Sequence, residues 1–180
     1  MKLKIKLMNG FLLCVLFLVG CSNEQTFEEF FHQEMKRMNK DENFTYALVH
    51  TELNAIHEDD AIAVFKEHNN LGEQIFIGYF EKNDNRWEWK QTRGAEWDTP
   101  HKWSAMHEIP YIYSGAISDI NIKEIYASTE KAVIINVEGN KRYWYAISPS
   151  KEVQVKFVRK DGTEEIVESI DEEMLKDWGT

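Results

Sequence analysis

The chain has 180 residues, of which 43% are hydrophobic and 29% charged, with only three prolines, so collagen-like, proline-rich and fully disordered classes are excluded. Asp and Glu outnumber Lys and Arg by 31 to 21, which gives a formal net charge of −10 at pH 7. Proteins that bind nucleic acid usually present a basic face, so this acidic balance argues against a nucleic acid as a partner.

The N-terminal segment has the three parts of a secretory signal. Three lysines lie within the first six residues, the run from Phe11 to Val19 is almost wholly apolar, and a small residue then precedes Cys21. The apolar stretch 7–20 is 14 residues long, whereas a helix that spans the hydrocarbon core needs about 20. We therefore expect residues 1–20 to be a signal peptide that is removed, and not a permanent transmembrane helix.

The tetrapeptide Leu18-Val19-Gly20-Cys21 resembles the lipobox of bacterial lipoproteins, in which a small residue precedes the cysteine that receives lipid. The resemblance implies a diacylglyceryl group on the Cys21 thiol, cleavage before Cys21, and an acyl chain such as palmitate on the new N-terminus. Two acyl chains, at about 0.8 kcal/mol per buried methylene, make a stable anchor where one would be marginal. Residues 21–25 would form a lipidated tether at the outer face of the cytoplasmic membrane. The alternatives are a cleaved signal with a chance cysteine and an internal apolar segment.

The mature chain is more acidic than the whole. Removal of residues 1–20 takes away three of the 21 basic residues and no acidic one, which leaves 18 against 31 and a formal charge of −13 over 160 residues. Cys14 leaves with the signal and Cys21 is consumed by lipid, so no thiol remains for a disulfide, a nucleophile or a zinc site. About 70% of the unfolded surface of such a chain is buried on folding, so we expect a single domain over residues 26–180.

A helix is predicted at the start of this domain. Thr26 and Glu29 have the spacing of a capping box. Large apolar side chains then recur at spacings of three and four, which predicts an amphipathic helix to about Asn39: Phe27, Phe30, Phe31, Met35 and Met38. This stripe could pack on the domain or form a groove for a partner, and packing is the general use of such a face.

From Phe44 onward the apolar period falls to two, as in strands with one buried face. Turn dipeptides such as Gly139-Asn140 separate the runs. We expect strands at Phe44–Thr51, Ala61–Glu67, Gln74–Glu81, Arg86–Thr92, Ile120–Tyr126, Val133–Glu138, Lys141–Ser148, Glu152–Arg159 and Thr163–Glu168. The predicted fold class is therefore mainly β, with antiparallel meanders in a sandwich-like or barrel-like arrangement, the N-terminal amphipathic helix, and a short C-terminal helix after Ser169.

Two of the predicted hairpins resemble each other. Phe80-Glu81 leads through a turn to an arginine and two tryptophans, and Val137-Glu138 leads through a turn to Arg142-Tyr143-Trp144-Tyr145. Two related halves of one β domain would explain this echo, and so would features that hairpins in general share.

Motifs that carry chemistry are few in the sequence. None of the six histidines has a second histidine at metal-binding spacing, and the sequence contains no G-x-S-x-G elbow, glycine-rich phosphate loop or EF-hand. We therefore predict no catalytic residue, no metal site and no cofactor. His57 with Glu58, Asp59 and Asp60 is the densest titratable cluster, either as a metal or acid–base group or as a solvated acidic loop.

The segment from Gly94 to Gly115, between the two series of strands, is rich in large aromatic residues. Tryptophan and tyrosine combine an apolar ring with a polar tip, which suits stacking on sugars or contact with a peptide. The same residues could instead form a buried plug at the end of the β domain. The candidate ligand-binding residues are Trp97, Trp103, Tyr111 and Tyr113.

A wider resemblance rests on aromatic motifs: Gly78-Tyr79-Phe80-Glu81-Lys82, Trp87-Glu88-Trp89, Trp97, Trp103-Ser104, Pro110-Tyr111-Ile112-Tyr113-Ser114-Gly115 and Arg142-Tyr143-Trp144-Tyr145. They are similar to a pattern in small lipoproteins of Gram-positive spore-forming bacteria. The resemblance covers most of the chain from Ala61 to Glu168. It implies a lipoprotein of a Gram-positive envelope, and it assigns no catalytic or binding residue.

These observations favour a membrane-anchored binding or accessory module whose partner is a cell-wall component, a peptide or an envelope protein. One alternative is an acidic, immunity-type protein that sequesters cationic peptides, because the mature charge of −13 would attract cations near the membrane. The other is an envelope hydrolase that uses Asp and Glu residues such as Glu96, Asp98 and Glu108, since paired carboxylates about 5 to 10 Å apart suit glycoside cleavage.

Overall fold

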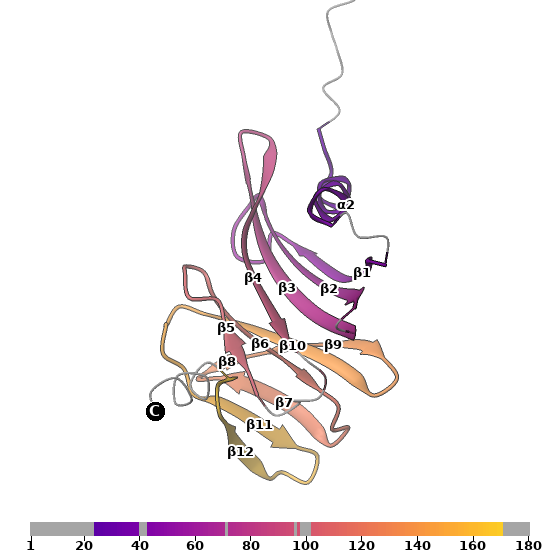
Figure 1. Cartoon of the computed structure of the whole chain (residues 1–180). Coiled ribbons are helices and arrows are strands. Elements are labelled where there is room, and N and C mark those ends of the chain that lie inside the picture. Colours follow the sequence, from indigo (N-terminus) through magenta and orange to yellow (C-terminus); the bar gives the residue numbers. More distant parts are fainter. Residues whose placement is uncertain (1–23, 40–42, 71, 96, 98–101, 171–180) are drawn as a thin grey trace, which may run out of the picture.

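The computed structural model describes residues 24–39, 43–70, 72–95, 97 and 102–170 (Figure 1). Within them the fold is mainly β, as predicted, with one helix and three antiparallel four-stranded sheets. The N-terminal sheet has the strand order β1 Thr45–Leu53, β2 Asp60–Asn69, β3 Gly72–Asn83 and β4 Arg86–Ala95. The middle sheet has the order β5 Ser104–Ala105, β6 Tyr111–Ile117, β10 Lys141–Ser148 and β9 Val133–Glu138. The C-terminal sheet has the order β12 Glu164–Val167, β11 Val155–Arg159, β7 Ile122–Ala127 and β8 Glu130–Lys131.

These elements are stacked as four layers: helix, N-terminal sheet, middle sheet and C-terminal sheet (Figure 1). Each gap between layers holds its own cluster of buried apolar side chains. The middle sheet is covered on both faces. In β10, Tyr143 and Tyr145 enter the cluster shared with the N-terminal sheet, whereas Trp144 and Ala146 enter the cluster shared with the C-terminal sheet.

Helix α2 covers Phe27–Met38 and packs on the outer face of the N-terminal sheet. The Thr26 hydroxyl accepts a hydrogen bond from the Glu29 N–H at 3.2 Å, and the Glu29 carboxylate accepts one from the Thr26 N–H at 3.0 Å. These two bonds satisfy backbone donors that the first turn would otherwise leave free. Three side chains of its apolar stripe are buried against the sheet: Phe27, Phe31 and Met35.

The strand β6 corrects the prediction of a long connection between Gly94 and Gly115. Residues Tyr111–Ile117 form a central strand of the middle sheet, paired with β5 on one side and β10 on the other. Six of its seven residues are buried because both faces of the sheet are covered, so the strand lacks the apolar and polar alternation that marks a half-exposed strand. By contrast, β9 and β10 have the predicted bounds, with the predicted turn at Gly139-Asn140 between them.

The two halves of the domain differ in topology, which is why the two similar hairpins do not extend to a repeated fold. The N-terminal sheet is a simple meander of consecutive strands. In the C-terminal half, β7 and β8 leave the middle sheet for the next layer before β9 and β10 return to it. The predicted C-terminal helix lies almost entirely in 171–180, outside the described residues.

A β-bulge in β4 changes which side chains enter the core. Trp87 and Trp89 face α2, but the pairing shifts by one residue at the next position, so Tyr79 pairs with Gln91 while Phe80 pairs with Trp89. Beyond the bulge, Arg93 faces the middle sheet and donates from Nε to the carbonyl of Ala105 at 2.6 Å. Without the extra residue, this guanidinium would lie under the helix.

Candidate functional site

Two of the four candidate aromatic residues belong to the core. Tyr113 is 1% exposed, and its hydroxyl oxygen lies 2.8 Å from the backbone carbonyl oxygens of both Ser150 and Lys151, which share its one proton as acceptors. Trp103 packs edge to face on Tyr113 with ring centroids 5.6 Å apart, and its indole N–H donates to the carbonyl of Val167 at 2.8 Å. Both polar tips are satisfied by backbone, so these rings act as the plug that the sequence also allowed.

Trp97 lies at the boundary between the N-terminal and middle sheets. Its indole N–H donates to Glu73 Oε1 at 3.1 Å, and the Lys141 ammonium lies 5.0 Å from the ring centroid. Lys141 also pairs with Glu73 at 2.8 Å, and Lys66 Nζ lies between Glu73 at 3.1 Å and Glu138 at 2.6 Å. Trp97 is therefore one member of an ionic network that joins the two sheets.

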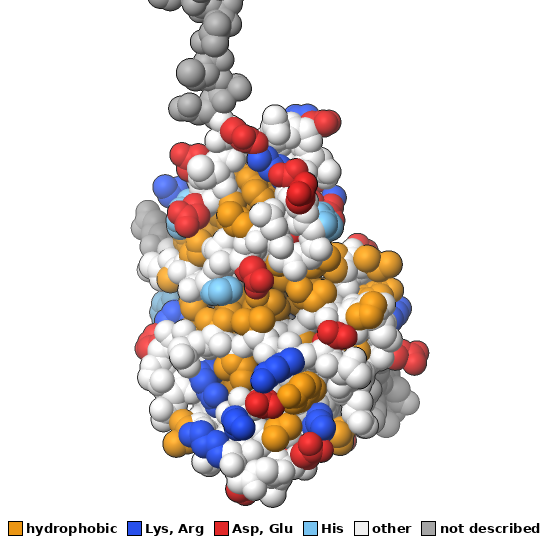
Figure 2. All heavy atoms as spheres, turned by 180° about the vertical axis from the view of Figure 1, so that it is seen from behind, with side chains coloured by type: hydrophobic (Ala, Val, Ile, Leu, Met, Phe, Trp, Pro, Cys, Tyr) orange, Lys and Arg blue, Asp and Glu red, His pale blue; other side chains and the backbone are white. Residues whose placement is uncertain are grey.

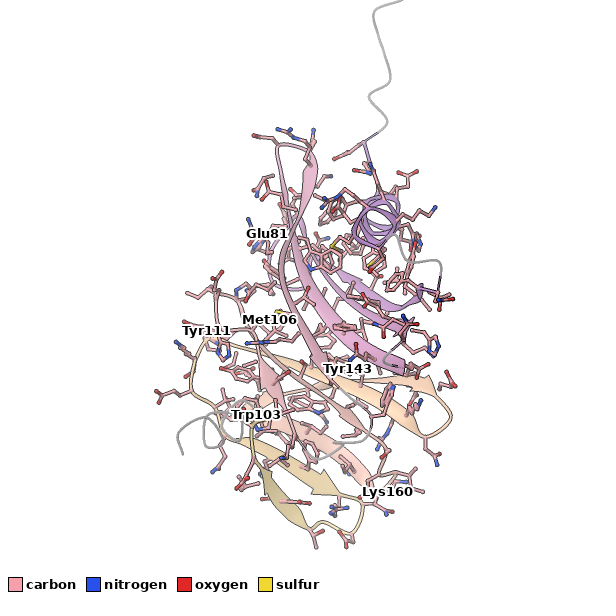
Figure 3. The ribbon with its side chains drawn as sticks, in the orientation of Figure 1. Glu81, Trp103, Met106, Tyr111, Tyr143 and Lys160 are labelled. Atoms are coloured by element: carbon pink, nitrogen blue, oxygen red, sulfur yellow. The ribbon has the colours of Figure 1, made fainter. Side chains whose placement is uncertain are left out.

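Tyr111 lines a hollow of about 480 Å³, and the other three candidates do not line it in the part of the chain that the structure describes. The walls come from the β1–β2 connection, the loop before β6, the end of β10 and the start of β8: Ile56, Ile109, Pro110, Tyr111, Glu130, Ile147, Ser148 and Pro149. Figure 3 shows Tyr111 where the N-terminal and middle sheets meet, with Trp103 further toward the C-terminal sheet.

The rim of this hollow is unusually apolar for a surface. Ile109 is 80% exposed, and Ile56 on the opposite wall is also exposed. On the face shown in Figure 2, hydrophobic side chains gather in a band where the N-terminal sheet meets the middle sheet. Exposed apolar patches of this kind mark interaction surfaces more often than single exposed residues do.

A polar network built on Asp60 supports the wall that carries Ile56. The Asp60 side chain is fully buried, and its carboxylate accepts the N–H groups of Ile56 at 3.2 Å and His57 at 3.0 Å. The prediction of a solvated acidic loop is thus wrong for Asp60, although Glu58 and Asp59 are exposed. The carboxylate is buried because the backbone of the β1–β2 connection folds around it and supplies the donors.

Tyr79 and Glu81 of β3 complete this network. The Tyr79 hydroxyl lies 3.1 Å from His57 Nε2, 3.1 Å from Glu81 Oε1 and 3.5 Å from Asp60 Oδ2. Burial, followed by the neighbouring Glu81 and Asp60 carboxylates, raises the pKa of Tyr79, so the phenol stays protonated and is not a nucleophile. The pKa of His57 is raised chiefly by the hydrogen bond to the Glu58 carbonyl and further by nearby carboxylates.

Sequence reasoning found His57 and Asp60 but missed Tyr79 and Glu81. These two residues are 19 or more positions away in sequence and reach the cluster only because β2 and β3 are paired, with Asp60 opposite Glu81. Ile109 could have indicated the hollow, because it is a large apolar residue between the polar His107-Glu108 and Pro110.

The structure gives less support to a hydrolase or a metal site. Of the three acids proposed for hydrolysis, Glu96 and Asp98 lie outside the described residues, and Glu108 is an exposed residue whose backbone bonds to Gln91. Among the described residues, no group of three His, Cys, Asp or Glu side chains is arranged to hold a metal ion. Cys21, the residue predicted to carry lipid, also lies outside the described part.

Within the described ranges, no helix has both the length and the apolar character needed to cross a bilayer. Comparison with protein-family models, with curated proteins and with solved structures finds no match to this chain.

Proposed function

We propose that the mature chain is a lipid-anchored extracytoplasmic module that binds its ligand in the hollow beside Tyr111. The lipobox-like sequence ending in Cys21 supports the anchor, and it would hold the domain at the outer face of the cytoplasmic membrane of a Gram-positive envelope. The domain would then act as a binding or accessory module and not as an enzyme.

The observation that carries the proposal is the hollow itself. Its volume of about 480 Å³ is in the range of ligand sites, and its walls are mostly apolar with a few polar groups at the edge. Ser148 and the Glu130 carboxylate offer the polar contacts. Such a site fits a ligand that inserts an apolar group, such as a peptide side chain, and hydrogen-bonds at the rim.

A second candidate function, sequestration of cationic peptides, is favoured by the charges around the same hollow. Glu130 lines it, Glu108 directly precedes Ile109, and the exposed Glu58 and Asp59 follow Ile56 within three residues. Two cations are also near in sequence: Lys131 directly follows Glu130, and Lys151 lies two residues after Pro149. Together with the mature charge of −13, this acidic rim would attract a peptide that presents both cationic and apolar side chains.

The test uses the lipidated protein in detergent micelles, titrated with peptidoglycan fragments and, separately, with a cationic amphipathic peptide. We expect one of the two to bind, and we expect Ile109→Ser and Tyr111→Ala each to weaken that binding about tenfold, which corresponds to about 1.4 kcal/mol. Ile166→Ser is the matched control, because Ile166 is also an exposed isoleucine, at 53%, but it lies on β12.

The outcomes separate the two functions. Affinity for the cationic peptide that falls steeply as salt rises supports sequestration, because exposed charges are screened over about 10 Å at 0.1 M salt. Binding of wall fragments with little salt dependence supports the accessory module. If both ligands bind the Ile109→Ser variant as well as the native protein, the hollow is not the site.

A further inference from the structure

The N-terminal end of α2 is held beside the hairpin formed by β3 and β4. Phe27, in the first turn, packs edge to face on Phe80 and Trp87, with ring centroids 5.0 and 5.1 Å apart. Before the helix, the Glu24 carboxylate pairs with the Lys82 ammonium, which also lies 5.8 Å from the centroid of the Trp87 ring. Figure 1 shows the start of α2 and the hairpin at the same end of the molecule.

The tether that would join this end to lipid is short. Two residues, Ser22 and Asn23, separate Cys21 from Glu24, and an extended chain covers at most about 3.6 Å per step, so the three steps reach about 11 Å. Strand β3 alone has 12 residues, which at about 3.3 Å each is about 40 Å. A domain fixed by so short a tether at one end cannot turn that end away from the bilayer.

The hairpin tip is polar and less acidic than the rest of the mature chain. A two-residue turn, Asp84-Asn85, joins the strands with φ of 50° and 61°, and the flanking Asn83 and Arg86 are exposed. The turn residues 82–86 carry two basic side chains and one acidic, and Lys82 is paired with Glu24, while Glu28 and Glu29 lie at the same end. Arg86 can bind lipid phosphate through its guanidinium.

From this arrangement, and assuming the proposed lipidation of Cys21, we infer that the tip of the β3–β4 hairpin is the membrane-facing surface of the domain. Its partner is the phospholipid headgroup layer. None of the exposed large hydrophobic residues that the structure describes lies in the turn 82–86. The tip therefore rests on the headgroups and does not insert into the hydrocarbon. The C-terminal sheet is then the end remote from the bilayer.

The inference can be tested with single-cysteine fluorescent probes on the lipidated protein in phosphatidylglycerol and phosphatidylcholine vesicles. Lipid occupies the Cys21 thiol, so Asn83→Cys and Lys160→Cys each introduce one reactive thiol. Both positions are exposed; Asn83 is at the hairpin tip, and Figure 3 shows Lys160 at the opposite end. With nitroxide-headgroup lipid as the quencher, we expect quenching at Asn83→Cys to exceed that at Lys160→Cys several-fold.

Two controls distinguish the effect of the tether length from that of lipidation. Insertion of 20 Gly and Ser residues between Asn23 and Glu24 adds a coil of about 25 Å, which should reduce the difference between the probes to less than half. Equal quenching at the two probes with the native tether overturns the inference. A difference that survives the long tether supports it and shows that headgroup contacts of the tip, and not the short tether, set the orientation. If mass spectrometry finds no lipid on Cys21, both the proposed anchor and the inferred orientation are wrong. If lipid is present and the two probes are quenched equally, only the inferred orientation is wrong.

Discussion

At the scale of single residues, the hydrogen bonds around His57 explain why its protonated form is favoured. The ring Nδ1 lies 2.7 Å from the Glu58 carbonyl, so that nitrogen carries a proton in either charge state. In the neutral ring, Nε2 must then accept, and the single Tyr79 proton can go to His57 or to Glu81 but not to both. Protonation of Nε2 removes this conflict, because His57 donates to Tyr79 and Tyr79 donates to Glu81.

The first prediction follows from this raised pKa. A nuclear magnetic resonance titration of the His57 ring should give a pKa above the ordinary value of 6.5. Because the pKa is higher in the folded state, the stabilisation is fully present below pH 6.5 and is lost as the pH rises through the folded value. The ring is 53% exposed, so the effect on unfolding free energy should stay well below about 1 kcal/mol.

The comparison is with His57→Gln, measured by urea unfolding between pH 5 and 8. The native protein should gain stability relative to this variant as the pH falls. A difference that does not change with pH would show that the folded protein does not favour the protonated ring.

The residue scale also shows how far the sequence could predict the site. His57 and Asp60 stood out because they are close together in the chain, but burial of Asp60 depends on backbone donors that no spacing rule reveals. The hollow draws its walls from four separate segments, so the exposed Ile109 was its only local sign. Of the four aromatic candidates, Tyr111 and Tyr113 lie two residues apart on the same face of β6, so neither composition nor spacing could tell the half-buried Tyr111 at the start of the strand from the buried Tyr113.

At the scale of elements, β6 depends on a close approach of backbone at Gly115. A Cβ atom at this position would lie 2.7 Å from the Lys102 carbonyl oxygen and 2.9 Å from Trp144 Nε1. Neither atom can move easily, since one is backbone and the other belongs to a fully buried indole. The glycine is therefore needed for packing, and its φ is not in the left-handed region.

The second prediction concerns this contact. Gly115→Ala should lower the free energy of unfolding by about 1 to 3 kcal/mol, the usual cost of an overpacked core. Chemical denaturation measures the change, and near-ultraviolet circular dichroism should report a shifted Trp144 environment. An unchanged midpoint of unfolding would mean that β5 and β6 separate at no cost.

A strand next to a recognisable turn was predictable even where both its faces are covered, whereas β6 was not. The turn dipeptide Gly139-Asn140 marks the end of β9 and the start of the doubly buried β10, and the two tryptophans of β4 lie on one face as their spacing predicts. In β6, burial on both sides removes the period on which such a prediction depends. The bulge in β4 also has no mark in the sequence, because it inserts one charged residue among others.

At the scale of the whole molecule, ionic contacts bind the N-terminal sheet to the middle sheet on the side where Trp97 lies. Glu73 of β3 takes hydrogen bonds from Lys141 of β10, Lys66 of β2 and Trp97. The Lys141 hydrogen bond and the further donation from Lys66 lower the pKa of Glu73 below its ordinary 4.5. The network thus contributes stability only while Glu73 is ionised.

The third prediction is that Glu73→Gln lowers the unfolding free energy at pH 7 by about 1 kcal/mol, since the carboxylate is only partly buried. A carboxyl whose pKa is depressed in the folded state stabilises above its unfolded value of 4.5, and this contribution is lost as the pH falls through the folded pKa. The variant should therefore lose less stability than the native protein below pH 4.5.

Glu164→Gln provides the matched control for this experiment. Glu164 pairs with Lys156 at 2.9 Å, but both lie within the outer C-terminal sheet and Glu164 is largely exposed. Its change should stay within about 0.5 kcal/mol. Equal losses in the two variants would contradict a special role for the contact between sheets.

The double burial of β10 couples the two clusters on either side of the middle sheet. Consecutive residues of this strand, Trp144 and Tyr145, are fully buried in different clusters, so removing the strand from its place strips both clusters at once. A partly unfolded form that keeps one of these clusters packed while the other is exposed would need β10 to stay in place with one face uncovered. We therefore expect such intermediates not to accumulate. At the proposed location outside the membrane, proteases would then find few partly unfolded molecules to cleave before global unfolding.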